Sequence, residues 1–299
     1  MAATDLKANI RTLPSLKDNY YNMKKTGLLF IIGCLAAMVS SAQFYYKDII
    51  SNKQLLSDMT AYKQNKVKTI NIKSFEDDGT ASEGFTCQKK FSKDYRKVTL
   101  FTSAAISGAS LQTATFNDNG LLAKTYDSSE ISITTNIYRY DFMDRIHSIL
   151  SSIRSQDDDF TNEIREEHIY QYNETGQAEK MIRVKNFTDS TTILFALDEN
   201  DNVGIEKDTK SGTKFYYYYD AKRRITDIVQ ENDFKKGLQP DYIFEYNNSA
   251  GLLSQMTTTE EGGNYYYIWK YSYENGLRVK EKCYNKEKRL MGTIEYEYK

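Results

Sequence analysis

A short phrase that recurs along most of the chain constrains its fold more than any other feature. An aromatic residue, followed by an acidic residue or asparagine, precedes a turn and a second strand-like run; the clearest copy runs from Tyr219-Asp220 to Arg224-Ile225. A repeat of this kind is one supersecondary unit that needs neighbours to bury its apolar face. We therefore expect consecutive β-hairpins that pack on one another. Their anchors lie 22 to 32 residues apart, at Phe116, Tyr140, Tyr172, Leu197, Tyr219, Tyr246 and Tyr273.

The composition also favours strands. The chain of 299 residues contains 25 Tyr and 14 Phe but only 2 Pro, and Pro interrupts the hydrogen-bond ladders of sheets. Apolar and polar side chains alternate in several segments, and Asn-Gly and Gly-Gly pairs supply turns. The segments are 69–75, 85–91, 97–103, 131–140, 146–153 and 292–299, and the turns are Asn119-Gly120, Gly262-Gly263 and Asn275-Gly276.

These patterns predict a mainly β fold for residues 67–299. We expect one repeat domain, a long antiparallel meander of hairpins that forms a twisted, curved sheet, open or partly wrapped around its own core. Charged residues on both faces of the strands argue against an outer-membrane barrel, whose outer band is apolar.

Residues 43–66 have a different pattern, with apolar residues at helical spacing. Leu55, Leu56, Met59 and Tyr62 lie on one stripe of a helix that we expect from about Lys47 to Gln64. An uncovered first strand would be a site for aggregation. We therefore predict an N-terminal amphipathic helix that caps the sheet, with this stripe buried against the strands of residues 68–103.

Residues 23–42 have the layout of a signal peptide. Lys24-Lys25 precede an apolar run over residues 27–39, and Ser40-Ser41-Ala42 supply small residues for cleavage before Gln43. The run is too short for a membrane-spanning helix, which needs about 20 apolar residues. The mature protein is then periplasmic, on the cell surface or secreted. Residues 1–22 form an uncertain extension, with Met23 as an alternative start.

The three cysteines suggest neither a disulfide framework nor a redox motif. Ile31-Ile32-Gly33-Cys34 resembles a bacterial lipobox, but the apolar run continues past Cys34, so we favour an ordinary signal peptide. Cys87 and Cys283 lie near opposite ends of the repeats, and we expect two free, buried thiols.

The recurring phrase resembles the YD (RHS-type) repeat family, in which Tyr-Asp, two variable residues, Gly, Arg or Asn, and Leu or Ile close a hairpin. The resemblance covers roughly residues 110–280 and is degenerate. Arg223 and Asp144 stand where Gly is expected, and Leu121 stands where Arg or Asn is expected. The resemblance implies hairpins whose Tyr packs across the sheet and whose acidic side chain bonds the turn backbone. Long RHS proteins resemble shells around toxin domains. We do not expect that role of this chain, which is far too short to form such a shell.

The sequence contains few residues and motifs suited to catalysis. The chain has two histidines, His147 and His168, which we expect as solvated strand residues, and it lacks phosphate-binding glycine loops and metal-ligand spacings. We expect no cofactor and no bound metal. With 40 basic and 41 acidic residues, the chain has no general attraction for nucleic acid.

We therefore expect a non-enzymatic exported scaffold or binding module of the Gram-negative cell envelope. It would be a monomer without a transmembrane segment after signal removal, and its partner would be an envelope protein or a glycan. The alternative is a carbohydrate- or peptide-binding protein that uses a Tyr-rich sheet face, and a third hypothesis is a carboxylate-dependent hydrolase. The ligand-binding residues of the Tyr-rich face would be Tyr217, Tyr219, Tyr266 and Trp269.

Overall fold

The computed structural model describes residues 44–299, except 106, 158–162, 232–239, 248, 250 and 261–264. The expected signal peptide, the extension before it, Cys34 and the Gly262-Gly263 turn lie outside the described residues. One helix, α3, covers Lys47–Gln64, as the spacing predicts. The strands that follow are β1 Thr69–Phe75, β2 Thr86–Phe91, β3 Lys97–Ala104, β4 Gly108–Phe116, β5 Leu122–Ser129, β6 Ser132–Tyr140, β7 Ile146–Ser155, β8 Glu163–Tyr172, β9 Ala178–Lys185, β10 Asp189–Leu197, β11 Val203–Asp208, β12 Lys214–Tyr219, β13 Ile225–Gln230, β14 Tyr242–Tyr246, β15 Leu253–Thr259, β16 Tyr266–Glu274, β17 Leu277–Asn285 and β18 Leu290–Tyr298.

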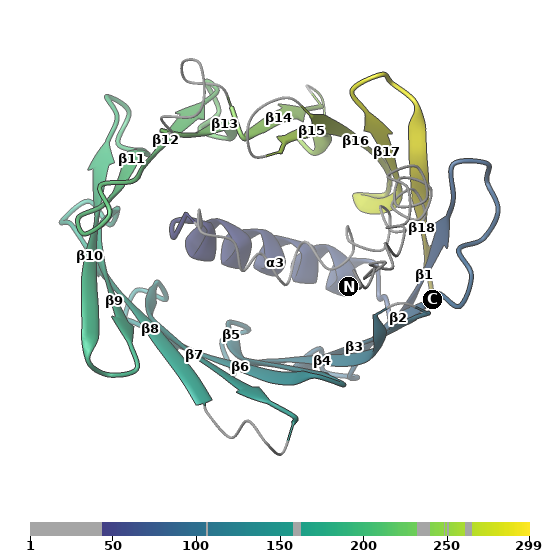
Figure 1. Cartoon of the computed structure of the whole chain (residues 1–299), viewed down its shortest axis with the longest axis horizontal. Helices are drawn as coiled ribbons and strands as arrows, with labels where there is room; N and C mark the ends of the chain where they lie inside the picture. The colour runs from purple at the N-terminus through teal and green to yellow at the C-terminus, as the bar shows by residue number, and fades with distance from the viewer. Residues whose placement is uncertain are drawn as a thin grey trace, which may run out of the picture. The chain divides into compact units, whose positions relative to one another are not determined.

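These strands form a closed barrel, in which each strand is antiparallel to the one before and the one after it (Figure 1). The ring closes between β1 and β18, whose register runs from Ile70 opposite Tyr298 to Phe75 opposite Thr293. An ion pair between Lys73 and Glu297 lies on this seam.

The expectation of an open or partly wrapped sheet is therefore wrong. A closed barrel of 18 strands has no edge strand to protect, because the last hairpin satisfies the hydrogen bonds of the first.

The turns of the repeat follow one geometry. In the best copy, Asp220 Oδ1 accepts hydrogen bonds from the backbone N–H groups of Lys222 at 2.9 Å and Arg224 at 3.0 Å, which confirms the predicted role of the acidic residue. The next-to-last turn residue adopts a left-handed conformation, with φ of +60° at Arg223 and +78° at Gly120. Only glycine adopts this conformation without steric cost, so Arg223 fits the turn less well than glycine would.

Most anchor tyrosines connect their hairpin to the previous one. The hydroxyls of four of the five anchor tyrosines, and that of Tyr298 at the end of β18, each donate to a backbone carbonyl near the start of the second strand of the preceding hairpin, at 2.6–2.9 Å. These bonds give a physical reason for tyrosine rather than phenylalanine at the anchor, since the ring packs and the hydroxyl satisfies a carbonyl. The pairs are Tyr140–Leu122, Tyr172–Ile146, Tyr219–Val203, Tyr246–Ile225 and Tyr298–Arg278.

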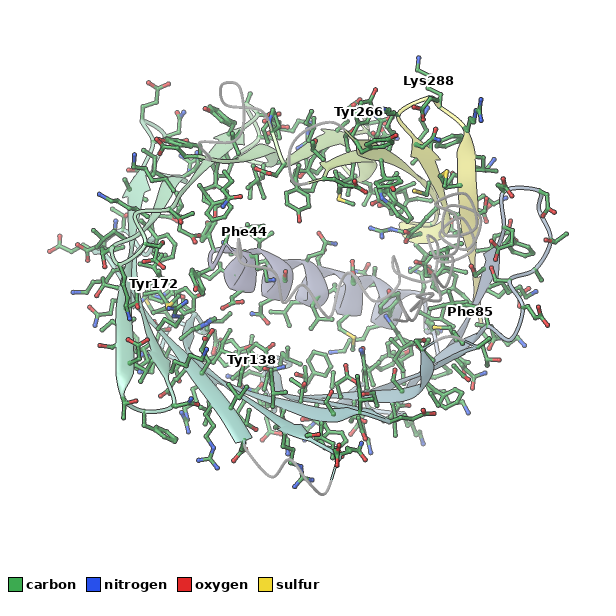
Figure 2. The ribbon with its side chains drawn as sticks, in the orientation of Figure 1. Phe44, Phe85, Tyr138, Tyr172, Tyr266 and Lys288 are labelled. Carbon is green, nitrogen blue, oxygen red and sulfur yellow. The ribbon has the colours of Figure 1, made fainter. Side chains whose placement is uncertain are left out.

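Helix α3 lies inside the ring of strands and contacts two opposite parts of the wall (Figure 1). Near its start, Ile49 belongs to a buried cluster with side chains of β7–β13. Near its end, Met59 belongs to a second cluster with Val67, Phe91 and Val98. Tyr138 packs against both clusters, and Figure 2 shows it between the strands and the helix. Burial of this apolar surface provides the main stabilisation of the helix.

The predicted stripe contacts the first strands, as expected, but it does so within a closed wall rather than along an edge. Leu55, Leu56 and Tyr62 are partly buried against the second cluster, and Met59 is buried.

Within the described residues, the cysteines Cys87 and Cys283 are free and buried. Among the described residues, no helix has the length and apolar character needed to cross a membrane.

Candidate functional site: the helix anchorage and the outer face

A buried carboxylate on β11 holds the start of the helix. Glu206 is 2% exposed, and its two oxygens accept hydrogen bonds from the backbone N–H groups of Tyr45 at 2.7 Å and Tyr46 at 2.9 Å. The hydroxyl of Tyr217 donates a third hydrogen bond, at 2.7 Å. Tyr46, the residue that precedes the helix, makes no side-chain capping bond of its own. Glu206 therefore caps the helix from the barrel wall, where a negative charge also complements the helix dipole.

The surroundings of Glu206 oppose its ionisation. Burial raises the pKa of its carboxyl to about 7, and the charge of Asp48 acts in the same direction. The three hydrogen bonds that Glu206 accepts favour the ionised form and limit this rise in pKa. The protonation state of this helix cap consequently changes near neutral pH.

A histidine on β8 makes a second attachment to the helix. His168 Nδ1 lies 2.6 Å from Asp48 Oδ2 on the helix, and His168 Nε2 lies 2.9 Å from Glu166 Oε1. Burial alone lowers the pKa of the imidazole, but Asp48 and Glu166 outweigh it and raise the pKa to about 9. His168 is therefore a buried cation between two carboxylates at neutral pH, whereas the sequence pattern predicted a solvated residue.

Further polar contacts reinforce the same attachment. The hydroxyl of Tyr170 lies 2.9 Å from both the Tyr45 carbonyl oxygen and Asp48 Oδ2, and either can accept its hydrogen bond. Arg183 donates a hydrogen bond to the hydroxyl of Tyr45, and the Tyr45 ring meets the His168 ring edge-on with centroids 5.2 Å apart.

Farther along the helix, the Tyr140 hydroxyl, which donates to the Leu122 carbonyl, lies 3.3 Å from Asn52 Oδ1. Glu206, Tyr217, His168, Tyr170 and Asp48 thus hold the start of the helix against the wall, and we call this group the helix anchorage.

The four predicted ligand-binding residues do not assemble into one exposed face. Tyr217 and Trp269 are buried, at 3% and 6% exposure, and the Tyr219 hydroxyl is bonded to the Val203 carbonyl. Tyr266, at 36% exposure, lies on β16 with Trp269 but on the opposite face. Strands β12 and β16 are separated by three others. Tyr217 instead belongs to the helix anchorage.

Sequence reasoning missed Glu206, Asp48 and the buried state of His168. The strand alternation places Glu206 and His168 on one face of their strands, but it cannot show that a helix occupies the space in front of that face. The pairing of Asp48 with His168 joins residues 120 positions apart. The sequence carries no local signal for it.

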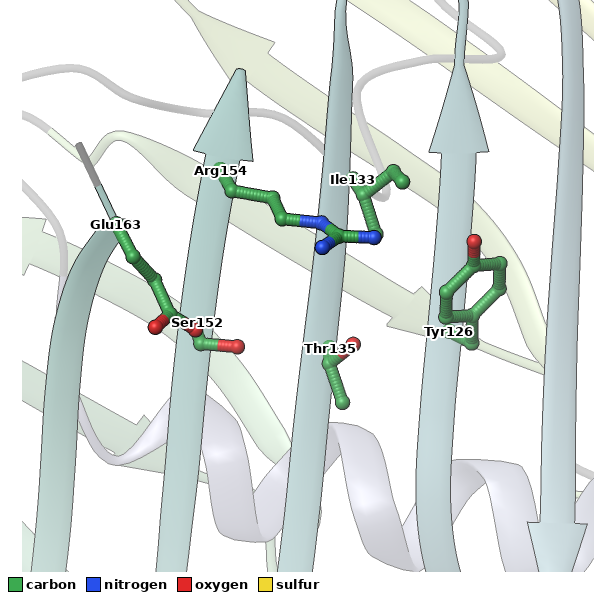
Figure 3. Close-up of a pocket in the computed structure, with 6 residues that line it drawn as sticks. All are labelled: Tyr126, Ile133, Thr135, Ser152, Arg154 and Glu163. Atoms are coloured by element: carbon green, nitrogen blue, oxygen red, sulfur yellow. The ribbon is translucent and has the colours of Figure 1, made fainter. Parts of the chain in front are cut away.

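A shallow hollow of about 200 Å³ lies on the opposite face of the wall, over β5–β8. The strand register places Tyr126, Thr135 and Ser152 in one row and Ile133, Arg154 and Glu163 in the next. This face is the outer one, because the inward residues of β6 and β7 include Tyr138 and Ile149, which alternate with them. Figure 3 shows the Arg154 side chain lying across the neighbouring strand.

The sequence matches no protein-family model and no curated protein. It is similar to a chain in the crystal structure of TcdB2-TccC3-TEV, with 11% identity and a TM-score of 0.36, over 71% of this chain but only 12% of that chain. It is also similar to a porin-like protein from Bacteroides uniformis, with 11% identity and a TM-score of 0.38, over 78% of this chain and 98% of that chain. A porin-like protein from Bacteroides vulgatus gives 12% identity and a TM-score of 0.29, over 78% and 98%. Similarities of this size assign neither a family nor a function.

Proposed function

We propose that this chain is an exported, non-enzymatic scaffold or binding module of the Gram-negative cell envelope. One observation supports this role above the others: two buried titratable groups of the wall, Glu206 and His168, are bonded to the helix inside the barrel or to the residues just before it. Glu206 accepts hydrogen bonds from the backbone N–H groups of Tyr45 and Tyr46, which precede the helix. His168 is paired with Asp48 on the helix. Groups fixed in this way stabilise the helix inside the wall, and the outer face of the barrel is then the surface on which partners bind.

The two other functions suggested by the sequence receive less support. A Tyr-rich binding face requires Tyr217 and Trp269 at the surface, and both are buried. A carboxylate-dependent hydrolase requires two carboxyl groups that face a substrate across a gap of about 5–10 Å. The buried carboxyl of Glu206 instead faces backbone N–H groups and the Tyr217 hydroxyl.

Cell fractionation combined with a binding assay tests the proposal. The protein should be recovered outside the cytoplasm with Gln43 at its N-terminus, and the purified protein should bind saturably to isolated cell envelopes. A chain that keeps residues 23–42 in a soluble cytoplasmic pool would contradict the export part. Purified protein that shows no saturable binding to envelopes would contradict the scaffold part.

A further inference from the structure

Two turns of the barrel contain the same reactive dipeptide in nearly the same local sequence. Asn119-Gly120 lies in the turn of the β4–β5 hairpin and Asn275-Gly276 forms the turn of the β16–β17 hairpin. Each pair follows an acidic residue and precedes a leucine, and both asparagines are exposed. An asparagine followed by glycine is chemically labile, because the glycine nitrogen attacks the side-chain amide and glycine has no Cβ to hinder the approach. Since the local sequences match, a difference in reactivity between the two sites in the folded protein comes from the structure.

The structure restrains both reacting groups at Asn119. The Gly120 N–H, which supplies the nucleophilic nitrogen, donates a hydrogen bond to the Asn117 carbonyl oxygen at 2.9 Å. The Asn119 side-chain amide also donates to Asp144 Oδ1, at the longer distance of 3.4 Å. Both contacts must break before the nitrogen can reach the amide carbon, so they slow the reaction at this site.

Asn275 lacks these restraints. Both residues of its turn have left-handed backbones, with φ of +51° at Asn275 and +76° at Gly276, as in a type I′ turn. Across the part of the chain that the structure describes, no hydrogen bond engages the Gly276 N–H or the Asn275 side chain. The Asn275 backbone carbonyl accepts a hydrogen bond from Asn65 Nδ2 at 3.4 Å, but this oxygen takes no part in the reaction. A left-handed backbone is also costly for a residue with a Cβ, so leaving it recovers that cost.

We propose that Asn275 is a site of spontaneous deamidation in the folded protein and that Asn119 is protected. The Gly276 nitrogen forms a bond to Asn275 Cγ while its proton passes to the side-chain nitrogen. The Cγ–Nδ2 bond then breaks and ammonia leaves. One water molecule opens the resulting cyclic imide at either carbonyl carbon, which gives aspartate or isoaspartate without any oxidant, reductant or cofactor.

The modification changes the turn in two ways. Either product adds a negative charge directly after Glu274. Isoaspartate also carries the backbone through the former side-chain carbon, which lengthens a two-residue turn whose geometry fixes the register of β16 and β17. Because Asn65 at the end of α3 contacts this turn, the change reaches one contact between the helix and the wall. The site is independent of the binding-module role.

Peptide mass spectrometry of the purified full chain, incubated at mildly alkaline pH, measures the loss of the side-chain amide at both positions over time. In the folded protein, deamidation at Asn275 should be about threefold to tenfold faster than at Asn119, the ratio that corresponds to one hydrogen bond that must be broken. The unfolded chain in urea is the matched control. Its two sites should react at nearly equal rates, because only the similar local sequences remain.

Asn275→Gln supplies the control variant, since the longer side chain disfavours ring closure. It should remove the product at position 275 and leave the slow reaction at Asn119 unchanged. A rate ratio in the folded protein no larger than that in the unfolded chain would overturn the proposal. So would an unmodified Asn275 in the folded protein under conditions in which the unfolded chain reacts.

Discussion

Replacing Glu206 by glutamine should remove a large part of the pH dependence of stability between pH 5 and pH 8. Glu206 is buried against the start of the helix, and burial raises the pKa of its carboxyl from the ordinary 4.5 to about 7. The folded protein therefore binds this proton more tightly than the unfolded chain. The resulting contribution to the free energy of unfolding is complete below pH 4.5 and is lost as the pH rises through about 7.

The expected loss follows from the two pKa values. One pKa unit corresponds to roughly 1.4 kcal/mol, so the rise from 4.5 to about 7 corresponds to about 3 kcal/mol. Glutamine does not titrate, so the free energy of unfolding of the variant should not show this decrease with pH. This holds even if the substitution changes the stability at pH 5.

Urea unfolding at pH 5, 6, 7 and 8 measures the effect, with the free energy of unfolding obtained by linear extrapolation. The wild-type value should fall more steeply with pH than that of Glu206→Gln, and the difference between them should change by about 3 kcal/mol. Glu179→Gln, at an exposed position of β9, is the control and should follow the wild type. Parallel curves for the wild type and Glu206→Gln would refute the assignment of Glu206 as a buried helix cap.

Three further predictions concern other positions, each measured by urea unfolding. His168→Gln should remove a second loss of stability, because a pKa raised from 6.5 to about 9 gives a contribution that is complete below pH 6.5 and lost through pH 9; an unchanged slope between pH 7 and pH 9 would contradict the pairing with Asp48. Arg223→Gly should stabilise the protein by about 0.5–1 kcal/mol and Gly120→Ala should destabilise it by about 1 kcal/mol, since both have left-handed backbones; the same sign for both would contradict the turn geometry. Tyr246→Phe should cost about 1 kcal/mol through the lost bond to the β13 carbonyl, while Tyr218→Phe, at an exposed position, should be neutral.

The features that local patterns determine were predictable from the sequence. The helix from Lys47 to Gln64 follows from apolar spacing, and the turn hydrogen bonds of Asp220 follow from the chemistry of the repeated phrase. Closure of the ring was not predictable in this way, because the pairing of β1 with β18 joins segments more than 200 residues apart. Alternation fixes which face a side chain occupies, but the environment of that face depends on the whole topology.

The anchorage illustrates the same limit at the level of single residues. His168 has the local sequence of a solvated strand histidine, and Tyr217 has that of an exposed aromatic. Both are buried because the helix crosses the inside of the barrel next to them. Two of the four side chains expected on the binding face, Tyr217 and Trp269, are instead buried.

Formation of an engineered disulfide across the β1–β18 seam tests the central claim, barrel closure, most directly. Asn71 and Glu297 are register partners, and opposite Cα atoms in antiparallel strands lie about 4.5–5.5 Å apart, within the range for a disulfide. In a chain carrying Cys34→Ser, the pair Asn71→Cys and Glu297→Cys should form an intramolecular disulfide on mild oxidation. The control pair, Asn71→Cys with Glu274→Cys on β16, should not. An open sheet would give no intramolecular bond between positions 71 and 297, and that result would contradict the closed barrel.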